Sequence, residues 1–219
     1  MKKLTATLLC AMMALTLAAA DKTGYVNMEA VFNGYYKTVN ENINFENQRK
    51  SFVDTMDIYR KEYQSSLQEY QKAKADAENE LLSTEARSAA ASRTKLLEGR
   101  LQQKQEEIMD YRDSGMREIE AKQQSVTNAL AEDLLAQTRQ YAAQKGYTVV
   151  LEVSGKSLSR IPVVIAYPKE AEFTDDLIQV INAGHEKEKA DAQARLDALR
   201  KQAEDEAKAA QEKAQAAQQ

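Results

Sequence analysis

One long stretch without helix-breaking residues limits what this chain can fold into. Residues 35–145 contain no proline and only two glycines, Gly99 and Gly115. Proline and glycine are the residues that most often interrupt or end a helix. Alanine, glutamate, lysine and glutamine, all good helix formers, are abundant along this stretch. The sequence therefore predicts very long helices. It changes character only after Gly146, where a β-branched run begins.

The apolar residues of this stretch recur at three- and four-residue spacing, which is typical of a helix packed along a partner. A break at "LLSTEAR" (81–87) divides the pattern, because Ser83 or Thr84 can cap a new helix and Glu85 suits its positive end. We expect an antiparallel helical hairpin over 36–140 with its turn near 82–84. A single continuous helix is the alternative. The first stripe contains Met56, Tyr59, Tyr63, Leu67, Tyr70, Ala73, Ala77 and Leu81.

The predicted seam between the two arms is imperfect. Polar residues such as Lys104, Gln105 and Lys122 lie at or beside positions that should be apolar. Gly99 and Gly115 are each expected to cost about 1 kcal/mol relative to alanine. The arms should therefore remain helical but pack weakly and flex.

Short β segments are predicted on both sides of the hairpin. Tyr25 and Val26 form a candidate strand, and Asn27 is a plausible N-cap for a helix that starts at Met28. After the helix stop at Gly146, runs 147–153 and 161–167 are typical of two strands joined by a turn. Thr174 is expected to cap a short helix that ends at Gly184.

These flanking segments, 21–35 and 141–184, predict a small β-containing head. A unit of this size buries little apolar surface, and a short sheet has open edges that can pair with another chain. We therefore expect the head to be an oligomerisation core. The fold class is mostly α with a small β head, a long helical hairpin on a short-stranded core. The proposed core positions are Tyr25, Val26, Val149, Leu151, Val164 and Ile165.

The two ends of the chain have distinct compositions. Residues 1–20 have a Lys2-Lys3 start, an apolar run and Ala18-x-Ala20, as in a cleaved signal peptide. A membrane anchor is the alternative. Residues 185–219 predict a polar tail, helical or disordered, whose only large apolar residues are Leu196 and Leu199. This tail is expected to bury no face, and His185 is expected to be solvated.

The composition disfavours several classes of function. The only cysteine, Cys10, lies in the predicted signal peptide, and His185 is the only histidine. Metal clusters and nucleophilic triads therefore lack components, and we expect no enzyme and no cofactor. The net charge is −4, or −6 without Lys2 and Lys3, so nucleic-acid binding has no electrostatic support.

Four segments of the chain resemble one known family. "GYVNMEAVF", "LLSTEAR", "AAQKGYTVVLEV" and "FTDDLIQVINA" are similar in order and spacing to the Skp family of OmpH-like periplasmic chaperones, over about residues 22–184. The resemblance implies a homotrimer with a joint β core and helical tentacles around a cavity. Such proteins hold unfolded outer-membrane proteins there without ATP. The acidic net charge and the segment 185–219 depart from the family pattern.

Two groups of side chains are candidates for contact with partners. Methionine and tyrosine adapt to many apolar surfaces, so a set of four could line the cavity, although ordinary seam packing is the alternative. A basic group near the hairpin tip could meet anionic membrane or acidic clients, although a solvated helix face is the alternative. A structural coiled-coil protein that bridges envelope partners through its tail is the second functional hypothesis. The first set is Met56, Met109, Tyr111 and Met116, and the second is Arg87, Arg93, Lys95, Arg100 and Lys104.

Overall fold

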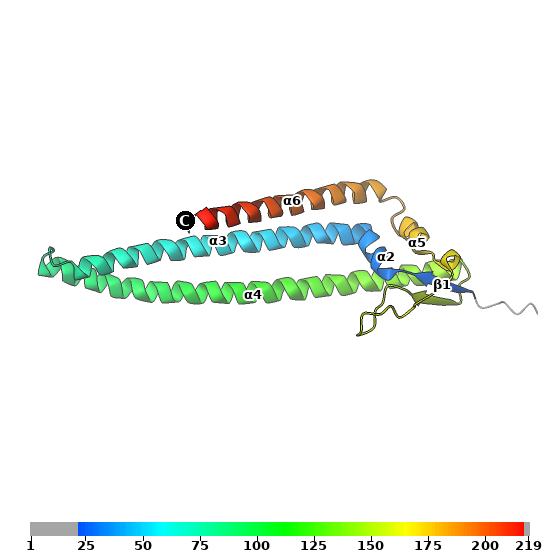
Figure 1. Cartoon of the computed structure of the whole chain (residues 1–219), viewed down its shortest axis with the longest axis horizontal. Coiled ribbons are helices and arrows are strands. Elements are labelled where there is room, and N and C mark those ends of the chain that lie inside the picture. Colours follow the sequence, from blue (N-terminus) through cyan, green and yellow to red (C-terminus); the bar gives the residue numbers. More distant parts are fainter. Residues whose placement is uncertain (1–21, 217–219) are drawn as a thin grey trace, which may run out of the picture. The chain divides into compact units, whose positions relative to one another are not determined.

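The computed structural model describes residues 22–216, so the predicted signal peptide at 1–20 lies outside the described residues (Figure 1). The chain is mostly helical with a small sheet, which confirms the predicted fold class. It divides into unit 1, residues 22–39 and 129–192, and unit 2, residues 40–128 and 193–216. The elements are β1 (Thr23–Val26), α2 (Met28–Gly34), α3 (Tyr36–Glu78), α4 (Thr84–Gln144), β2 (Val149–Glu152), the 3-10 turn η1 (Lys169–Ala171), α5 (Thr174–Ile181) and α6 (Glu186–Ala216).

The sheet of unit 1 consists of two parallel strands. Thr23 pairs with Val149 and Val26 with Glu152, so β1 and β2 run in the same direction. Parallel neighbours need a crossover connection, and here α2, α3 and α4 together form it. β1 also makes a parallel bridge to Glu172, on which Phe173 N donates to Tyr25 O at 2.9 Å. Among residues 22–216, the outer edge of β2 therefore has no partner, whereas the outer edge of β1 carries only this single bridge.

The strand predicted over 161–167 is absent from the structure, and that prediction is wrong. An isolated antiparallel bridge joins Lys156 to Pro162, and Val163 N donates to Gly155 O at 2.9 Å. Pro162 has no N–H to continue a ladder, and Arg160 turns the chain with φ +61°. The apolar residues that follow remain outside the sheet. β2 is also shorter than the predicted run 147–153.

Most predicted helix boundaries are confirmed by their backbone geometry. Asn27 Oδ1 accepts from Ala30 N at 2.8 Å, as an N-cap of α2 should. Ser83 Oγ accepts from Ala86 N at 3.2 Å and caps α4, so the hairpin turn occupies residues 79–83. Gly146 and Gly184 adopt φ +73° and +81°, the left-handed conformation that ends a helix.

Thr174 has a different role from the one predicted. It is the first residue of α5, Phe173 occupies the N-cap position, and no side chain caps this helix. The Thr174 hydroxyl instead accepts from Asn27 N at 2.9 Å and donates to Glu172 Oε1 at 2.8 Å. Thr174 thus joins the start of α2 to the start of α5. Because Asn27 is distant in sequence, this role could not be inferred from the neighbouring residues.

The core of unit 1 forms where β1, α2 and α5 meet the ends of the long helices. Phe173 stacks on Tyr141 and Tyr147 with ring centroids 5.2 and 5.0 Å apart. Gly24 is needed there, because a Cβ would lie 2.7 Å from the Phe173 ring. The buried apolar residues are Val26, Val31, Tyr35, Val39, Leu130, Leu134, Tyr141, Ala142, Phe173, Leu177 and Ile181.

The predicted tail forms helix α6, and the expectation that it buries no face is wrong. Ala192 and Leu196 are only 5% and 2% exposed. One leucine and a neighbouring alanine make a narrow apolar contact. The prediction missed it because it looked for several large apolar residues at helical spacing. His185 is also not simply solvated, because its ring stacks on Tyr36 with centroids 4.0 Å apart.

The side-chain amide of one buried residue, Asn182, bonds the backbone groups at the junction between α2 and α3. Asn182 Oδ1 accepts from Tyr36 N at 2.8 Å, and its Nδ2 donates to Gly34 O at 2.9 Å. The same Nδ2 donates to Ile178 O at 2.7 Å. Asn182 is 5% exposed, so these backbone groups have little access to water. The side chain thus bridges the end of one helix and the start of the next.

We predict that Asn182→Ala lowers the free energy of unfolding by about 1–3 kcal/mol, because it leaves buried backbone groups without partners. Urea denaturation followed by circular dichroism measures this change. Gln179→Ala, at an exposed position of the same helix, is the control and should be nearly neutral. Equal stability of the two variants would show that the bridge is dispensable.

Candidate functional site

The arms of unit 2 pack antiparallel as a two-helix hairpin (Figure 1). Lys104 Nζ contacts Glu62 Oε2 at 2.7 Å, and Arg93 contacts Glu69 at 3.6 Å nearer the turn. Residue numbers therefore rise on α3 as they fall on α4. Met56, Ala73 and Leu97 are buried between the arms. The hairpin alternative is thus observed, and the continuous helix is not.

An aromatic cluster lies in the seam of the hairpin. Phe52 stacks on Tyr111 with centroids 5.5 Å apart, and Tyr59 lies 5.2 Å from the same ring. A Cβ on Gly115 would lie 2.6 Å from the Phe52 ring. Gly115 is therefore a socket for Phe52, and the expectation that it only weakens the arm is wrong. Gly99 has no atom within 4 Å of the corresponding position.

The four proposed client-contact residues separate into two pairs. Met56 is 6% exposed and Tyr111 stacks on Phe52, which favours seam packing for both. Met109 and Met116 are 43% and 58% exposed, and a seven-residue spacing places them on one face of α4. Three further exposed apolar residues of the unit 2 helices were not predicted from the sequence. Their positions outside the seam stripe are the signal that could have identified them. The three residues are Val53, Ile58 and Leu96.

Of the proposed basic tip, only Arg87 lies in the first turn of α4, and the other four residues follow along its shaft. Lys104 and Arg93 pair with glutamates of α3, which favours the interpretation as a solvated face. The turn itself carries Leu81, which is 94% exposed. Its neighbours Glu78, Glu80 and Glu85 make the apex acidic. An acidic apex disfavours direct contact of the turn with an anionic membrane.

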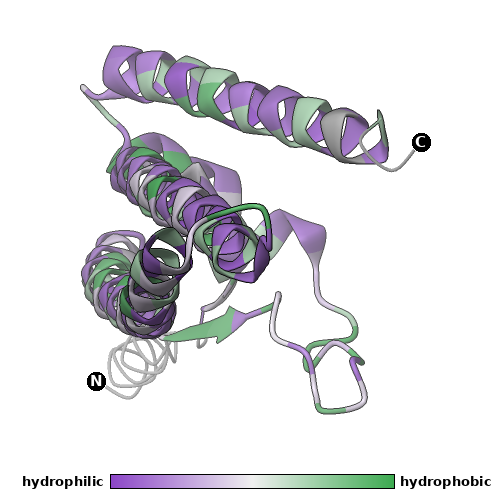
Figure 2. Cartoon of the chain, turned by 90° about the vertical axis from the view of Figure 1, so that its left-hand side faces the viewer, coloured by the Kyte–Doolittle hydropathy of each residue, from purple (hydrophilic) through white to green (hydrophobic). Residues whose placement is uncertain are grey.

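Of the six proposed oligomerisation residues, two lie on β2 and two lie in the segment that follows it. Val149 and Leu151 are 44% and 40% exposed, and Ile165 is 82% exposed. Figure 2 shows hydrophobic stretches in the segment between β2 and α5. Val164 is half-buried. The remaining two belong to contacts within the chain, because Val26 is buried and Tyr25 stacks on Tyr167 with centroids 4.8 Å apart.

Glu152 holds the end of β2 in place. Its carboxylate accepts from Gly155 N at 2.6 Å, Ser154 N at 2.7 Å and Met28 N at 3.2 Å, and also from the Ser154 hydroxyl. Burial raises the pKa of Glu152, but these hydrogen bonds lower it more, so the pKa lies below its usual value. The charged carboxylate thus connects the exposed edge strand to the start of α2.

The described residues contain no group of three or more side chains arranged to hold a metal ion. Within residues 22–216, no helix is both long and apolar enough to cross a membrane. What the geometry does provide is an arm with exposed apolar residues and an edge strand, β2, that carries exposed apolar side chains.

We predict that Gly115→Ala destabilises the hairpin, because the new methyl group would displace the Phe52 ring from its socket. The loss from overpacking, about 1–3 kcal/mol, should exceed the gain in helix propensity of about 1 kcal/mol. Gly99→Ala is the matched control and should stabilise by about 1 kcal/mol, since it meets no neighbour. Thermal unfolding at 222 nm compares the two variants, and stabilisation by both would contradict the socket.

Comparison with known proteins agrees with this geometry. A search of curated proteins finds no match to the chain. The family model described as outer membrane protein (OmpH-like) matches residues 22–181, most of the chain. Proteins of this family are periplasmic chaperones of outer-membrane proteins, and the family is not one of enzymes. The chain therefore belongs to the OmpH-like family, as its resemblance to Skp predicted.

Proposed function

We propose that this protein is an ATP-independent periplasmic holdase that keeps unfolded outer-membrane proteins soluble until they insert into the membrane. It is secreted through a cleaved signal peptide and works as a homotrimer with three arms around a cavity. The observation that carries the proposal is the match to the OmpH-like family together with an arm that exposes apolar residues outside its seam.

The arms offer the kind of surface that a holdase needs. A chaperone that releases its clients without ATP should bind them through weak contacts that adapt to many sequences. Methionine is flexible and polarisable, and Met109 and Met116 lie about 10 Å apart along α4 at 1.5 Å per residue. Their exposure leaves them available to an unfolded chain.

The open edge of β2 supports assembly through the head. An exposed edge with apolar side chains is a template for pairing with another chain. Val149 and Leu151 lie on β2, and Ile165 lies in the segment that follows. Residues 164–167, which follow the single bridge at Pro162 and pair with no strand among the described residues, would gain a partner from a neighbouring copy. We propose that three copies close this edge and form the joint β core.

We predict that Val149→Asp with Leu151→Asp yields a folded monomer. Both side chains are about 40% exposed in the single chain, at 44% and 40%, so charge there should disturb assembly more than folding. Light scattering measures the mass, and circular dichroism checks the fold. Val180→Asp, at a 54% exposed apolar position of α5, is the control and should keep the assembled mass. A double variant with unchanged mass would place the interface elsewhere.

We predict that Met109→Ser with Met116→Ser weakens binding of a labelled, unfolded outer-membrane barrel protein roughly three- to tenfold. The loss follows from removing apolar surface that contacts the client. Fluorescence anisotropy measures Kd, and Gln105→Ser with Gln123→Ser at exposed positions of the same helix is the control. If the unaltered protein binds no unfolded barrel, the holdase proposal fails and a bridging role in the envelope becomes the better account.

A further inference from the structure

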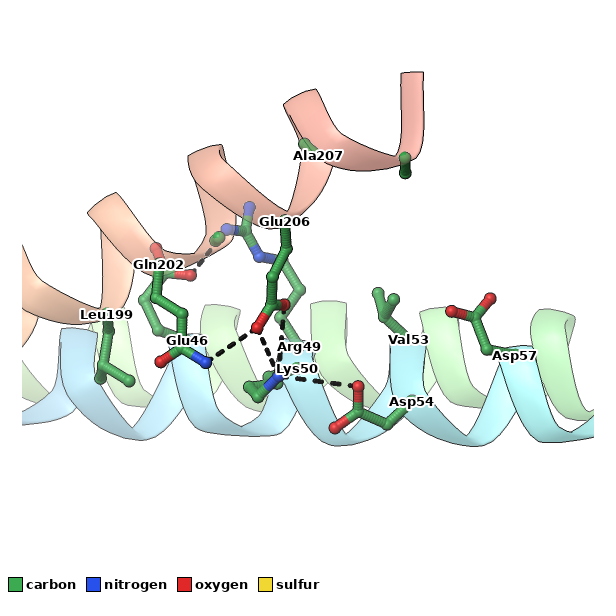
Figure 3. A pocket seen from close by; sticks show the side chains of 12 residues that line it. Glu46, Arg49, Lys50, Val53, Asp54, Asp57, Leu199, Gln202, Glu206 and Ala207 are labelled. Carbon is green, nitrogen blue, oxygen red and sulfur yellow. Dashed lines mark hydrogen bonds and ion pairs between the residues drawn. The ribbon is translucent and has the colours of Figure 1, made fainter. Parts of the chain in front are cut away.

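Within unit 2, α6 lies against a second face of α3 (Figure 3). The residues of α3 that face it, here called the strap face, are Glu46, Lys50, Val53 and Asp57. Their three- and four-residue spacing places them along one side of the helix. The seam toward α4 uses other positions, including Phe52 and Tyr59. The segment beyond the family match thus covers part of an arm without using its seam.

Two ion pairs, one of them fully at the surface, join α6 to the strap face. Lys50 Nζ lies 3.4 Å from Glu206 Oε2, and Arg200 Nε lies 3.8 Å from Glu46 Oε1. The Lys50 and Glu206 side chains are 42% and 56% exposed, so salt should screen this contact strongly. Salt can therefore weaken the contacts of α6 from Leu199 onward, while the buried Leu196 anchors the part of the helix before them.

The charges of the strap face keep partners on α3 itself. Lys50 also lies 3.7 Å from Asp54, and Glu46 also contacts Arg49 at 2.7 Å. If α6 were released, Lys50 and Glu46 would each keep an oppositely charged partner on α3. This arrangement lowers the cost of separating the two helices, because no buried charge loses its only partner.

The contact between the helices is incomplete. A groove of about 420 Å³ remains between α3 and α6, and Val53, Leu199, Ala203 and Ala207 line it. Val53 is 48% exposed although α6 lies above it. The polar faces of α6 carry their own i,i+4 bonds, including Gln193 to Asp197 at 2.9 Å and Gln202 to Glu206 at 2.8 Å. α6 can therefore stay helical when it leaves α3.

We propose that α6 is a reversible strap, which covers the strap face when docked and yields it to an unfolded client when released. This proposal rests on the proposed function. The occupant that competes with α6 is an unfolded outer-membrane barrel strand, in which apolar and polar residues alternate. The strap face suits such a segment, because it combines the apolar Val53 with charges of both signs. α6 thus lowers client affinity until a client or salt displaces it.

Locking the strap tests the proposal. Lys50→Cys with Glu206→Cys, joined by a short bismaleimide, fixes α6 on α3 in a chain from Asp21 onward, which has no other cysteine. We expect the locked protein to bind a labelled, unfolded eight-stranded barrel protein roughly threefold or more weakly than the same variant without cross-linker. Gln193→Cys with Asp197→Cys joins α6 only to itself and is the matched control, with unchanged affinity expected. Equal affinity of locked and unlocked protein would overturn the strap.

A measurement without client separates the strap from the holdase proposal. Spin labels at Val53→Cys and Ala207→Cys, across the groove, report the distance between α3 and α6. We expect one short distance in about 0.05 M salt and a broad, longer distribution in about 1 M salt. At about 1 M salt the Debye length is about 3 Å, so the surface ion pairs are largely screened. An unchanged distribution would overturn the strap. If no protein variant binds the barrel but the distance still changes with salt, the strap stands and the holdase proposal fails.

Discussion

Parallel pairing of β1 with β2 is the constraint on which the architecture depends. The strands adjoin in register although the two long helices separate them in sequence. Parallel strands cannot be joined by a tight turn, so the chain must leave the sheet and return. Here the excursion is the helical hairpin itself. Thr174 and Glu152 then bond the start of α2, and Asn182 bonds the start of α3, where the excursion begins.

The arm itself is thin, and this determines what it can do. Two helices meet along one seam, so much of each helix surface stays in contact with solvent. The Phe52 ring packs closely over Gly115, whereas Lys104 pairs with Glu62 where a seam would usually hold an apolar residue. The seam therefore keeps the two helices side by side, while much of their surface remains exposed to solvent and available to different partners. The strap on α3 would add a way to change how much of that surface is open.

Local signals in the sequence predicted much of the fold. Asn27, Ser83, Gly146 and Gly184 act on the backbone of their own segments, so their roles could be inferred from neighbouring residues. Features that depend on distant partners were missed or misread: Thr174 bonds Asn27, Gly115 receives Phe52, and α6 rests on α3. Residues 161–167 have strand composition but make only one isolated bridge among the described residues, at Pro162. Among the candidate site residues, Met56 and Met109 were both predicted to contact clients, but only Met109 is exposed. The stacking of Tyr111 depends on Phe52 from the other helix, which the neighbouring sequence does not reveal.

The central claim is that several arms, held together at one β core, enclose an unfolded client. Native mass spectrometry of the chain from Asp21 onward tests it most directly, first alone and then with an unfolded barrel protein. The account predicts the mass of three copies alone and of three copies with one client in the mixture. A single-copy mass, or a three-copy mass that gains no client, would contradict it.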